Sequence, residues 1–261
     1  MSVTATTRLA MVRPPRAIVS AGVASVRARP DDAAELVDQA SYGEVMTCLG
    51  RSGEWTFAQG PDLYFGWFRT SGLAEPAAGP ERRIVAVLLA DVHAAATETS
   101  AVVDALPAGT SLGTVPARGG WAVVAPDRYV RMDDLVAESG VVRRYPTPAD
   151  LIATAESFIG VPYLWGGTSA RGIDCSGLTQ RVYFLNGVGL DRDADQQALG
   201  GRPVDVARPG DLFFFGAEGV THTAIATGER TFIHAPQSGK TVQRGELTDA
   251  SRIRAIRRYL P

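Results

Sequence analysis

A weak internal repeat limits the folds open to this chain more than any other feature of its sequence. Val26 aligns with Val92 and Trp55 with Trp121, and both pairs are offset by 66 residues. Across residues 17–137, short apolar runs alternate with turn signals such as "RSGEW" and "PARGGW", which is typical of short strands. A shared offset indicates two copies of one unit, so we predict two small β barrels of about five strands each.

Composition and charge exclude several classes of protein. The 261 residues are 45% hydrophobic with a net charge of −2, so we expect a soluble globular protein without a nucleic-acid partner. The apolar run 17–26 is too short to span a membrane and is expected to be a strand. No apolar leader is visible at the N-terminus, which predicts a cytoplasmic protein, or an exported one if the natural chain is longer. The two cysteines, Cys48 and Cys175, make no disulfide framework, which also favours a reducing compartment.

The stretch "YPTPAD" ends the β pattern. Thr147 or Asp150 can cap a helix over residues 151–160, and a second helix is expected at about 176–186. The apolar side of the first helix consists of Leu151, Ile152, Ala155, Phe158 and Ile159. From residue 205 the β pattern returns in "GDLFFFG", "HTAIATG", "RTFIHA" and "RIRAIRRYL". Two helices followed by an antiparallel sheet predict an α+β domain.

The stretch "WGGTSARGIDCSGL" contains a cysteine suited to chemistry, Cys175. It follows Asp174, which can cap the helix that begins there. The N-terminus of a helix lowers the pKa of a thiol, because free N–H groups stabilise the thiolate. A nucleophilic thiol also needs a base and a group that orients the base. His222 and His234 lie 12 residues apart on adjacent predicted strands and suit these two roles in either order, whereas His93 lies in the second repeat.

Three other interpretations of these residues remain open. Cys175, His222 and His234 could bind zinc, with or without Asp174, but zinc sites usually contain a tight ligand pair such as C-x₂-C. The glycine loop could hold a phosphate, but it lacks G-x-x-x-x-G-K-[ST]. The histidines could be hydrogen-bonded core residues. A cysteine at a helix start together with two histidines on facing strands favours catalysis, and we expect neither a metal nor a cofactor.

The segment "PYLWGGTSARGIDCSGL" resembles the active-site block of NlpC/P60 cysteine peptidases, P-Y-x-W-G-G…G-x-D-C-S-G. Further matches follow in the family's order: "DADQQALGG", "RPGDLFFFG", "THTAIATG" and "FIHAP". The resemblance covers residues 150–261. It implies a papain-like fold with Cys175 as nucleophile, His222 as base and His234 as the third polar residue. Family members cleave peptide bonds in bacterial cell-wall peptides, most often between D-γ-glutamate and a diamino acid.

The repeat resembles bacterial SH3 (SH3b) domains. The matching features are a Gly-Glu pair at Gly43, the "GEW" turn that ends at Trp55, and "YFGWFRTSGL". The second copy keeps "GGW" but lacks the second tryptophan, so it is degenerate. These matches divide the chain into SH3b-like domains at 1–78 and 79–144, joined by the linker "EPAAGPERR", and a peptidase domain at 145–261.

This domain order narrows the resemblance to γ-D-glutamyl-L-diamino acid endopeptidases, which process released murein peptides with a free N-terminal L-alanine. In those enzymes the first SH3b domain closes one end of the cleft. The implied cleft residues are Tyr163, Asp174, Ser176, Tyr64 and Glu35. Glu44 competes with Glu35 in the alignment. A carboxylate and a hydroxyl at the cleft suit a buried ammonium group, which must find acceptors. Asp174 can serve as a helix cap at the same time.

The leading hypothesis is a cysteine endopeptidase for soluble murein peptides, active in cell-wall peptide recycling. The alternatives are an NlpC/P60 hydrolase of intact peptidoglycan, an amidase or acyltransferase on the same fold, and a non-catalytic wall-binding protein. The complete set of Cys175, His222 and His234 argues against the last one. The third substrate residue, diaminopimelate or lysine, stays open. We expect the arginines of "RIRAIRRYL" on a solvated strand face rather than against an acidic substrate, and no membrane partner.

Overall fold

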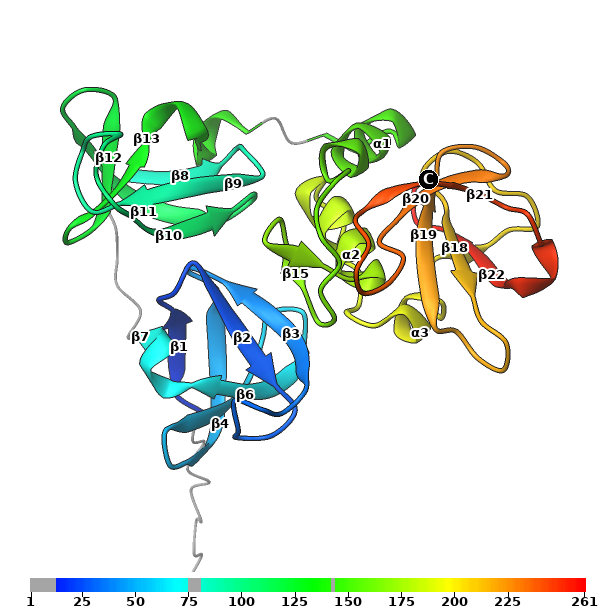
Figure 1. The fold of residues 1–261 in the computed structure, drawn as a ribbon, viewed down its shortest axis with the longest axis horizontal. Helices are drawn as coiled ribbons and strands as arrows, with labels where there is room; N and C mark the ends of the chain where they lie inside the picture. Colours follow the sequence, from blue (N-terminus) through cyan, green and yellow to red (C-terminus); the bar gives the residue numbers. More distant parts are fainter. Residues whose placement is uncertain (1–12, 75–80, 142–143) are drawn as a thin grey trace, which may run out of the picture.

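The computed structural model describes residues 13–74, 81–141 and 144–261. These residues form two β units and an α+β domain, which appear in Figure 1 as a blue-to-cyan body, a green body and a body that runs from green at α1 to red. This arrangement confirms the predicted fold class. The N-terminal segment 1–12, on which the expectation about a leader rests, and residues 75–80 of the expected linker lie outside the described residues. The last three linker residues, 81–83, were expected to connect the units but begin strand β8 (Glu81–Val85), because they pair with β11 (Ser111–Ala117).

The first β unit is a sheet of seven strands in the order β3-β2-β6-β5-β4-β1-β7. The strands are β1 (Arg16–Val19), β2 (Val23–Arg27), β3 (Leu36–Ser41), β4 (Val45–Ser52), β5 (Trp55–Gln59), β6 (Phe65–Arg69) and β7 (Leu73–Ala74). The apolar run 17–26 was expected to be one strand. It belongs to β1 and β2, because the chain bends at Ala21 and Gly22.

The second β unit repeats this order strand by strand, β10-β9-β13-β12-β11-β8-β14, which confirms the internal repeat. Its strands are β8 (Glu81–Val85), β9 (Leu89–His93), β10 (Val102–Pro107), β11 (Ser111–Ala117), β12 (Trp121–Ala125), β13 (Arg128–Arg131) and β14 (Leu135–Ala137). Trp55 and Trp121 begin equivalent strands and are both buried, with Arg69 and Arg131 over their rings at 4.5 and 5.3 Å. Each unit has seven strands rather than about five, because strands of two or three residues show no alternation in sequence.

The α+β domain has its helices before its main sheet, as predicted. Its helices are α1 (Pro148–Ser157), α2 (Cys175–Leu185) and α3 (Ala194–Gln197). The hairpin β15 (Thr168–Ser169) and β16 (Gly172–Ile173) precedes α2. The sheet β17-β22-β18-β19-β20-β21 consists of β17 (Arg202–Pro203), β18 (Leu212–Phe215), β19 (His222–Ala226), β20 (Thr231–His234), β21 (Gln243–Glu246) and β22 (Ile253–Arg258).

Both predicted caps act at the start of α1. Thr147 is the N-cap, and Asp150 completes a capping box with it. Leu151, Ala155 and Phe158 are buried as expected. Ile159 is not: its side chain is 39% exposed, because α1 ends at Ser157 and the chain turns away before Ile159 could continue the apolar side.

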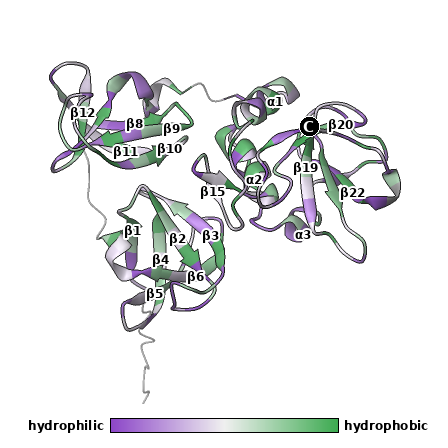
Figure 2. Cartoon of the chain, viewed as in Figure 1, coloured by the Kyte–Doolittle hydropathy of each residue, from purple (hydrophilic) through white to green (hydrophobic). Residues whose placement is uncertain are grey.

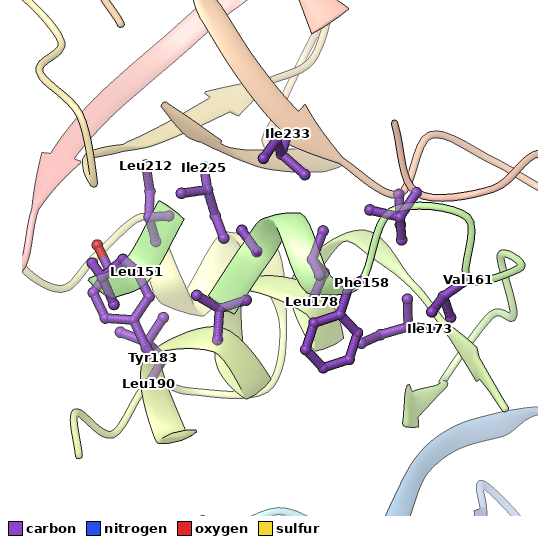
Figure 3. Packing of buried hydrophobic residues seen from close by; sticks show 14 of the residues in the cluster. Leu151, Phe158, Val161, Ile173, Leu178, Tyr183, Leu190, Leu212, Ile225 and Ile233 are labelled. Atoms are coloured by element: carbon purple, nitrogen blue, oxygen red, sulfur yellow. The ribbon is translucent and has the colours of Figure 1, made fainter. Parts of the chain in front are cut away.

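Each body has its own hydrophobic core, and hydrophobic residues are spread over all three in Figure 2. In the α+β domain, Leu178 of α2 packs with Ile225 and Ile233 of the sheet (Figure 3). Full burial of one such side chain contributes about 1.5–3 kcal/mol. This packing fixes α2, and therefore Cys175 at its first position, against β19. Within the described ranges, no helix is long and apolar enough to cross a membrane.

Candidate active site

Cys175 is the first residue of α2, with Asp174 as the N-cap. The Asp174 carboxylate accepts a hydrogen bond from the Gly177 N–H at 2.6 Å, as a helix cap does. Cys175 is 9% exposed, and the backbone N–H groups of Ser176 and Thr223 face its thiol. Since Thr223 belongs to β19, the thiol lies against the strand that His222 begins.

The two histidines come from neighbouring antiparallel strands. His222 is the first residue of β19 and His234 the last of β20. His222 Nε2 lies 2.8 Å from His234 Nδ1, and the ring planes are inclined by 76°. The contact occupies one nitrogen of each ring. It therefore leaves His222 Nδ1 to act toward a neighbour, and it gives the two histidines distinct positions that sequence spacing did not.

Burial dominates the electrostatics of these three side chains. It raises the pKa of the Cys175 thiol to about 11, and the negative charge of Asp174 acts in the same direction. Burial lowers the pKa of His222 to about 4, helped by the nearby His234 and Arg252, and it lowers the pKa of His234 to about 4. The helix start was expected to lower the thiol pKa. The N–H groups of Ser176 and Thr223 do act that way, but loss of solvent outweighs them.

Arg192, which the sequence did not mark as a site residue, is buried near Cys175. Its guanidinium donates to Asp174 at 2.8 and 3.2 Å and to Ser176 Oγ at 2.9 Å. It also forms a 2.7 Å ion pair with Asp38 on β3 of the first β unit. Burial disfavours the guanidinium charge, but the two carboxylates outweigh this effect and raise the pKa of Arg192. A buried cation thus joins the two residues that flank Cys175 to another domain.

Asp174 has little acceptor capacity left. Its carboxylate accepts from the Gly166 N–H at 2.8 Å and from Ser176 Oγ at 3.3 Å, besides Gly177 and Arg192. A carboxylate offers about four lone-pair sites. The capping hydrogen bond shows that Asp174 is a helix cap. Binding of an ammonium by Asp174 stays a prediction. The Ser176 hydroxyl is likewise held between Asp174 and Arg192.

Two predicted residues of the first β unit reach the α+β domain. Tyr64 donates from its hydroxyl to Asp193 at 3.1 Å. Glu35 is exposed, and its carboxylate accepts from Trp165 Nε1 at 2.8 Å. Glu44 instead lies near Arg181 of α2: burial raises the pKa of Glu44, while the Arg181 charge opposes the shift. Of the two competing glutamates, Glu35 is the one that contacts the glycine loop.

Tyr163 lies close to Cys175. Burial raises the pKa of its hydroxyl to about 12, with further contributions from the charges of Cys175 and Asp174. Its backbone forms a bridge to Ile173, the second residue before Cys175.

The remaining candidates lie elsewhere. His93 packs edge-on against Trp121 at 4.9 Å, within the second β unit. Arg252 and Arg254 are exposed, as expected for a solvated strand face, and Arg254 also donates to the Gly216 carbonyl. Arg257 and Arg258 are half-buried instead: Arg257 donates to the Ala198 carbonyl, and Arg258 pairs with Asp211. Across residues 13–74, 81–141 and 144–261, no three His, Cys, Asp or Glu side chains are grouped to hold a metal ion.

Signals for the missed residues are weak. Arg192 immediately precedes the "DADQQALGG" match, yet an arginine in a loop carries no mark of burial. Asp38 and Gln39 follow each other on β3, and the alternation of "LVDQAS" gives no indication that both contact another domain.

Comparisons with known proteins agree with this geometry. Residues 160–257 match the NlpC/P60 family, and residues 26–73 match the bacterial dipeptidyl-peptidase SH3 domain. The chain resembles a crystal structure of an NlpC/P60 family protein from Bacillus cereus, with a TM-score of 0.80 over 95% of this chain and 100% of that one. At 23% identity this likeness concerns the fold.

Three curated relatives illustrate the sequence similarity. The gamma-D-glutamyl-L-lysine dipeptidyl-peptidase of Bacillus subtilis is 37% identical over 49% of this chain, and the match spans less than half, 44%, of that relative. Dipeptidyl-peptidase 6 of Lysinibacillus sphaericus is 29% identical over 89% of this chain and 92% of its own length. A probable endopeptidase of Corynebacterium glutamicum is 31% identical over 60% of this chain and 78% of its own length. The chain therefore belongs to the NlpC/P60 family of peptidases, with a bacterial SH3 domain ahead of its papain-like α+β domain.

Proposed function

We propose that this protein is a cysteine endopeptidase that cleaves the γ-D-glutamyl–diamino acid bond of murein peptides with a free N-terminal L-alanine. One observation carries the proposal. The first β unit places Tyr64 and Asp38 on the residues around Cys175, through the 3.1 Å contact to Asp193 and the 2.7 Å ion pair to Arg192. We infer that these contacts close one end of the substrate site, which suits a short free peptide and which a domain that only tethers the enzyme would not need.

We assign Cys175 as the nucleophile, His222 as the base and His234 as the orienting group. The contact of His222 with His234 and the position of the Cys175 thiol against Thr223, the residue after His222, support this assignment. In the neutral pair, His222 donates from Nε2 to His234 Nδ1, which leaves His222 Nδ1 as a proton acceptor. The high thiol pKa and the low imidazole pKa favour a neutral resting pair. His222 then removes the thiol proton as the sulfur attacks the substrate.

The reaction proceeds by two acyl transfers. The Cys175 sulfur attacks the γ-carbonyl of D-glutamate, and N–H groups of the first turn of α2 stabilise the oxyanion. Collapse of the intermediate breaks the C–N bond, and protonated His222 gives its proton to the departing amine of the diamino acid. Water, deprotonated by His222, then hydrolyses the thioester, which releases the γ-glutamyl carboxylate and returns the proton to Cys175.

An excess of carboxylates beside the nucleophile supports recognition of an ammonium. The charged groups that act on one another there are Asp38, Glu44, Asp62, Asp174 and Asp193 against Arg181 and Arg192. Asp174 is saturated by its partners. Glu35 and Asp193 each accept one hydrogen bond from the facing domain and keep further acceptor sites, so they suit direct contact with the N-terminal ammonium.

The names of relatives support the bond class. Two matched proteins are called gamma-D-glutamyl-L-lysine dipeptidyl-peptidases. The activity of this chain is our proposal, since it spans less than half of their length. We place the enzyme in the cytoplasm, where a soluble peptide with a free amine fits recycling. The competing function is hydrolysis of intact peptidoglycan, which would tolerate a blocked N-terminus.

Mass spectrometry of the products from L-Ala-γ-D-Glu-diaminopimelate and from its N-acetylated form tests the proposal. We expect L-Ala-γ-D-Glu and free diaminopimelate from the first peptide. Acetylation deletes the charge, adds bulk and leaves carboxylates unpaired, so kcat/KM should fall by at least about two orders of magnitude. Equal cleavage of both peptides would favour the intact wall as substrate. The same assay with lysine in place of diaminopimelate decides which diamino acid is preferred at the third position.

A further inference from the structure

Three domains converge on one largely buried carboxylate, that of Asp104 in the second β unit. Its Oδ2 accepts from the backbone N–H of Gly22 in the first β unit at 2.8 Å. Its Oδ1 accepts from Arg171 Nη2 of the α+β domain at 3.1 Å. Arg128 of its own unit lies 3.2 Å away, and the Asp104 side chain is only 15% exposed. The Ala105 N–H also donates to Oδ1, at 2.8 Å. A shielded carboxylate with two cationic partners and two N–H donors is a strong junction.

The partner of Asp104 in the α+β domain leads directly to the nucleophile. Arg171 is in the turn of hairpin β15–β16, and Asp174 and Cys175 follow this hairpin in the chain. The first β unit holds the other side of the same hairpin, since Gln39 Oε1 accepts from the Thr168 N–H at 3.0 Å. In Figure 1 the hairpin points from α2 toward the two β units. Both units therefore fix the segment that leads into Cys175.

Close backbone packing makes these contacts stiff. A side chain at Gly22 would collide with the carbonyl oxygen of Ala105. At Gly109, with φ +80°, an added Cβ would lie 2.7 Å from Leu185 at the end of α2. Leu88 packs against the core of the α+β domain. Contacts this close leave little room for the domain motion that polar interfaces usually allow.

We propose that the second β unit is a brace that holds the first β unit against the catalytic site, with Asp104 as a positioning residue for substrate selection. The proposal rests on the proposed function. It assigns to this unit an indirect part in recognising the free N-terminus: the brace sets the position of Glu35 and Tyr64 relative to Cys175, while the chemistry of the thiol and histidines is unaffected.

The test compares Asp104→Ala, Asp104→Asn and Arg171→Gln with the control Asp133→Ala, which removes an exposed ion-paired carboxylate from the same unit. Kinetics are measured with the free and the N-acetylated diaminopimelate tripeptide. For Asp104→Ala we expect KM for the free peptide to rise about tenfold, with kcat within about twofold of the parent. The free-to-acetylated ratio of kcat/KM should fall by the same factor. Asp104→Asn keeps an acceptor for the Gly22 N–H, so its KM and its selectivity should lie between those of the parent and of Asp104→Ala. Asp133→Ala should match the parent in both.

Hydrogen exchange on the same full-length proteins separates the possible failures. We expect faster exchange at the Gly22 and Thr168 amides in Asp104→Ala, and at Thr168 in Arg171→Gln. If the parent does not discriminate between the peptides, the proposed function fails, and exchange still reports on the brace. If folded Asp104→Ala and Arg171→Gln keep both the parental selectivity and the parental exchange, the brace is refuted. Should Asp104→Ala fail to fold, Arg171→Gln decides alone, because Arg171 is 42% exposed.

Discussion

Arg192 Nη2 lies 2.8 Å from Asp174 Oδ2, and Arg192 Nε lies 2.7 Å from Asp38, so one guanidinium serves two carboxylates from different domains. Two carboxylates that share one cation leave a net negative charge in the interior. Burial accordingly raises the pKa of Asp38 to about 7, against the pull of Arg192. The arrangement holds the N-cap of α2 and the first β unit together.

Arg192→Met should destabilise the protein far more than Asp38→Asn. Removal of the cation leaves two buried carboxylates without their cationic partner, which should lower the free energy of unfolding by about 3–5 kcal/mol. Asp38→Asn leaves the pair of Arg192 and Asp174 intact. Chemical denaturation at pH 7.5 measures both variants, and equal midpoints would show that the guanidinium is not the element that holds the interface.

Cys175 should be the nucleophile. Cys175→Ala is expected to lower kcat by roughly three orders of magnitude or more. Iodoacetamide near neutral pH should label Cys175 well before Cys48, because His222 can take the thiol proton as the sulfur reacts. In His222→Asn that advantage should disappear. A nearly normal rate for Cys175→Ala would end the hypothesis.

The pH dependence of kcat/KM should have an unusually acidic lower limb. His222 must be neutral to accept the thiol proton, and burial lowers its pKa to about 4. Activity should therefore persist well below pH 6.5 and fall only near pH 4. In the unfolded chain His222 has its ordinary pKa of about 6.5, so there it binds a proton at a higher pH than in the folded protein. The free energy of unfolding should therefore decrease as the pH falls from about 6.5 toward 4. A kinetic limb at about 6.5 would instead indicate a solvated imidazole.

Glu35→Gln should weaken selection for the free N-terminus without disturbing the thiol. The amide keeps an acceptor for Trp165 but removes the charge that suits an ammonium. We expect KM for the free tripeptide to rise about five- to tenfold and kcat/KM for the N-acetylated peptide to stay within about twofold. Glu54→Gln is the matched control, since Glu54 is an exposed carboxylate of the same unit, paired with Arg69. The same loss in both variants would point to a general charge effect.

Much of the fold, and the candidate site residues, could be predicted from local sequence. The constant offset in residue number between Trp55 and Trp121 indicated the repeated unit, because equivalent strands need equivalent buried residues. Asp174 before Cys175 marked a helix start, because capping depends on neighbours two or three positions away. Patterns of this kind can be recognised in the sequence because they depend on residues that are close together along the chain or that recur at a fixed spacing.

The arrangement around those residues was decided only by tertiary structure. Arg192 and Asp38 are separated by 154 residues, and Asp104 and Arg171 by 67, so neither pair has a local pattern. The thiol and imidazole pKa values follow the loss of solvent around Cys175 and His222, which depends on every element packed there. The positions of the two histidines came from the register of β19 and β20, since spacing alone allows either to face the thiol.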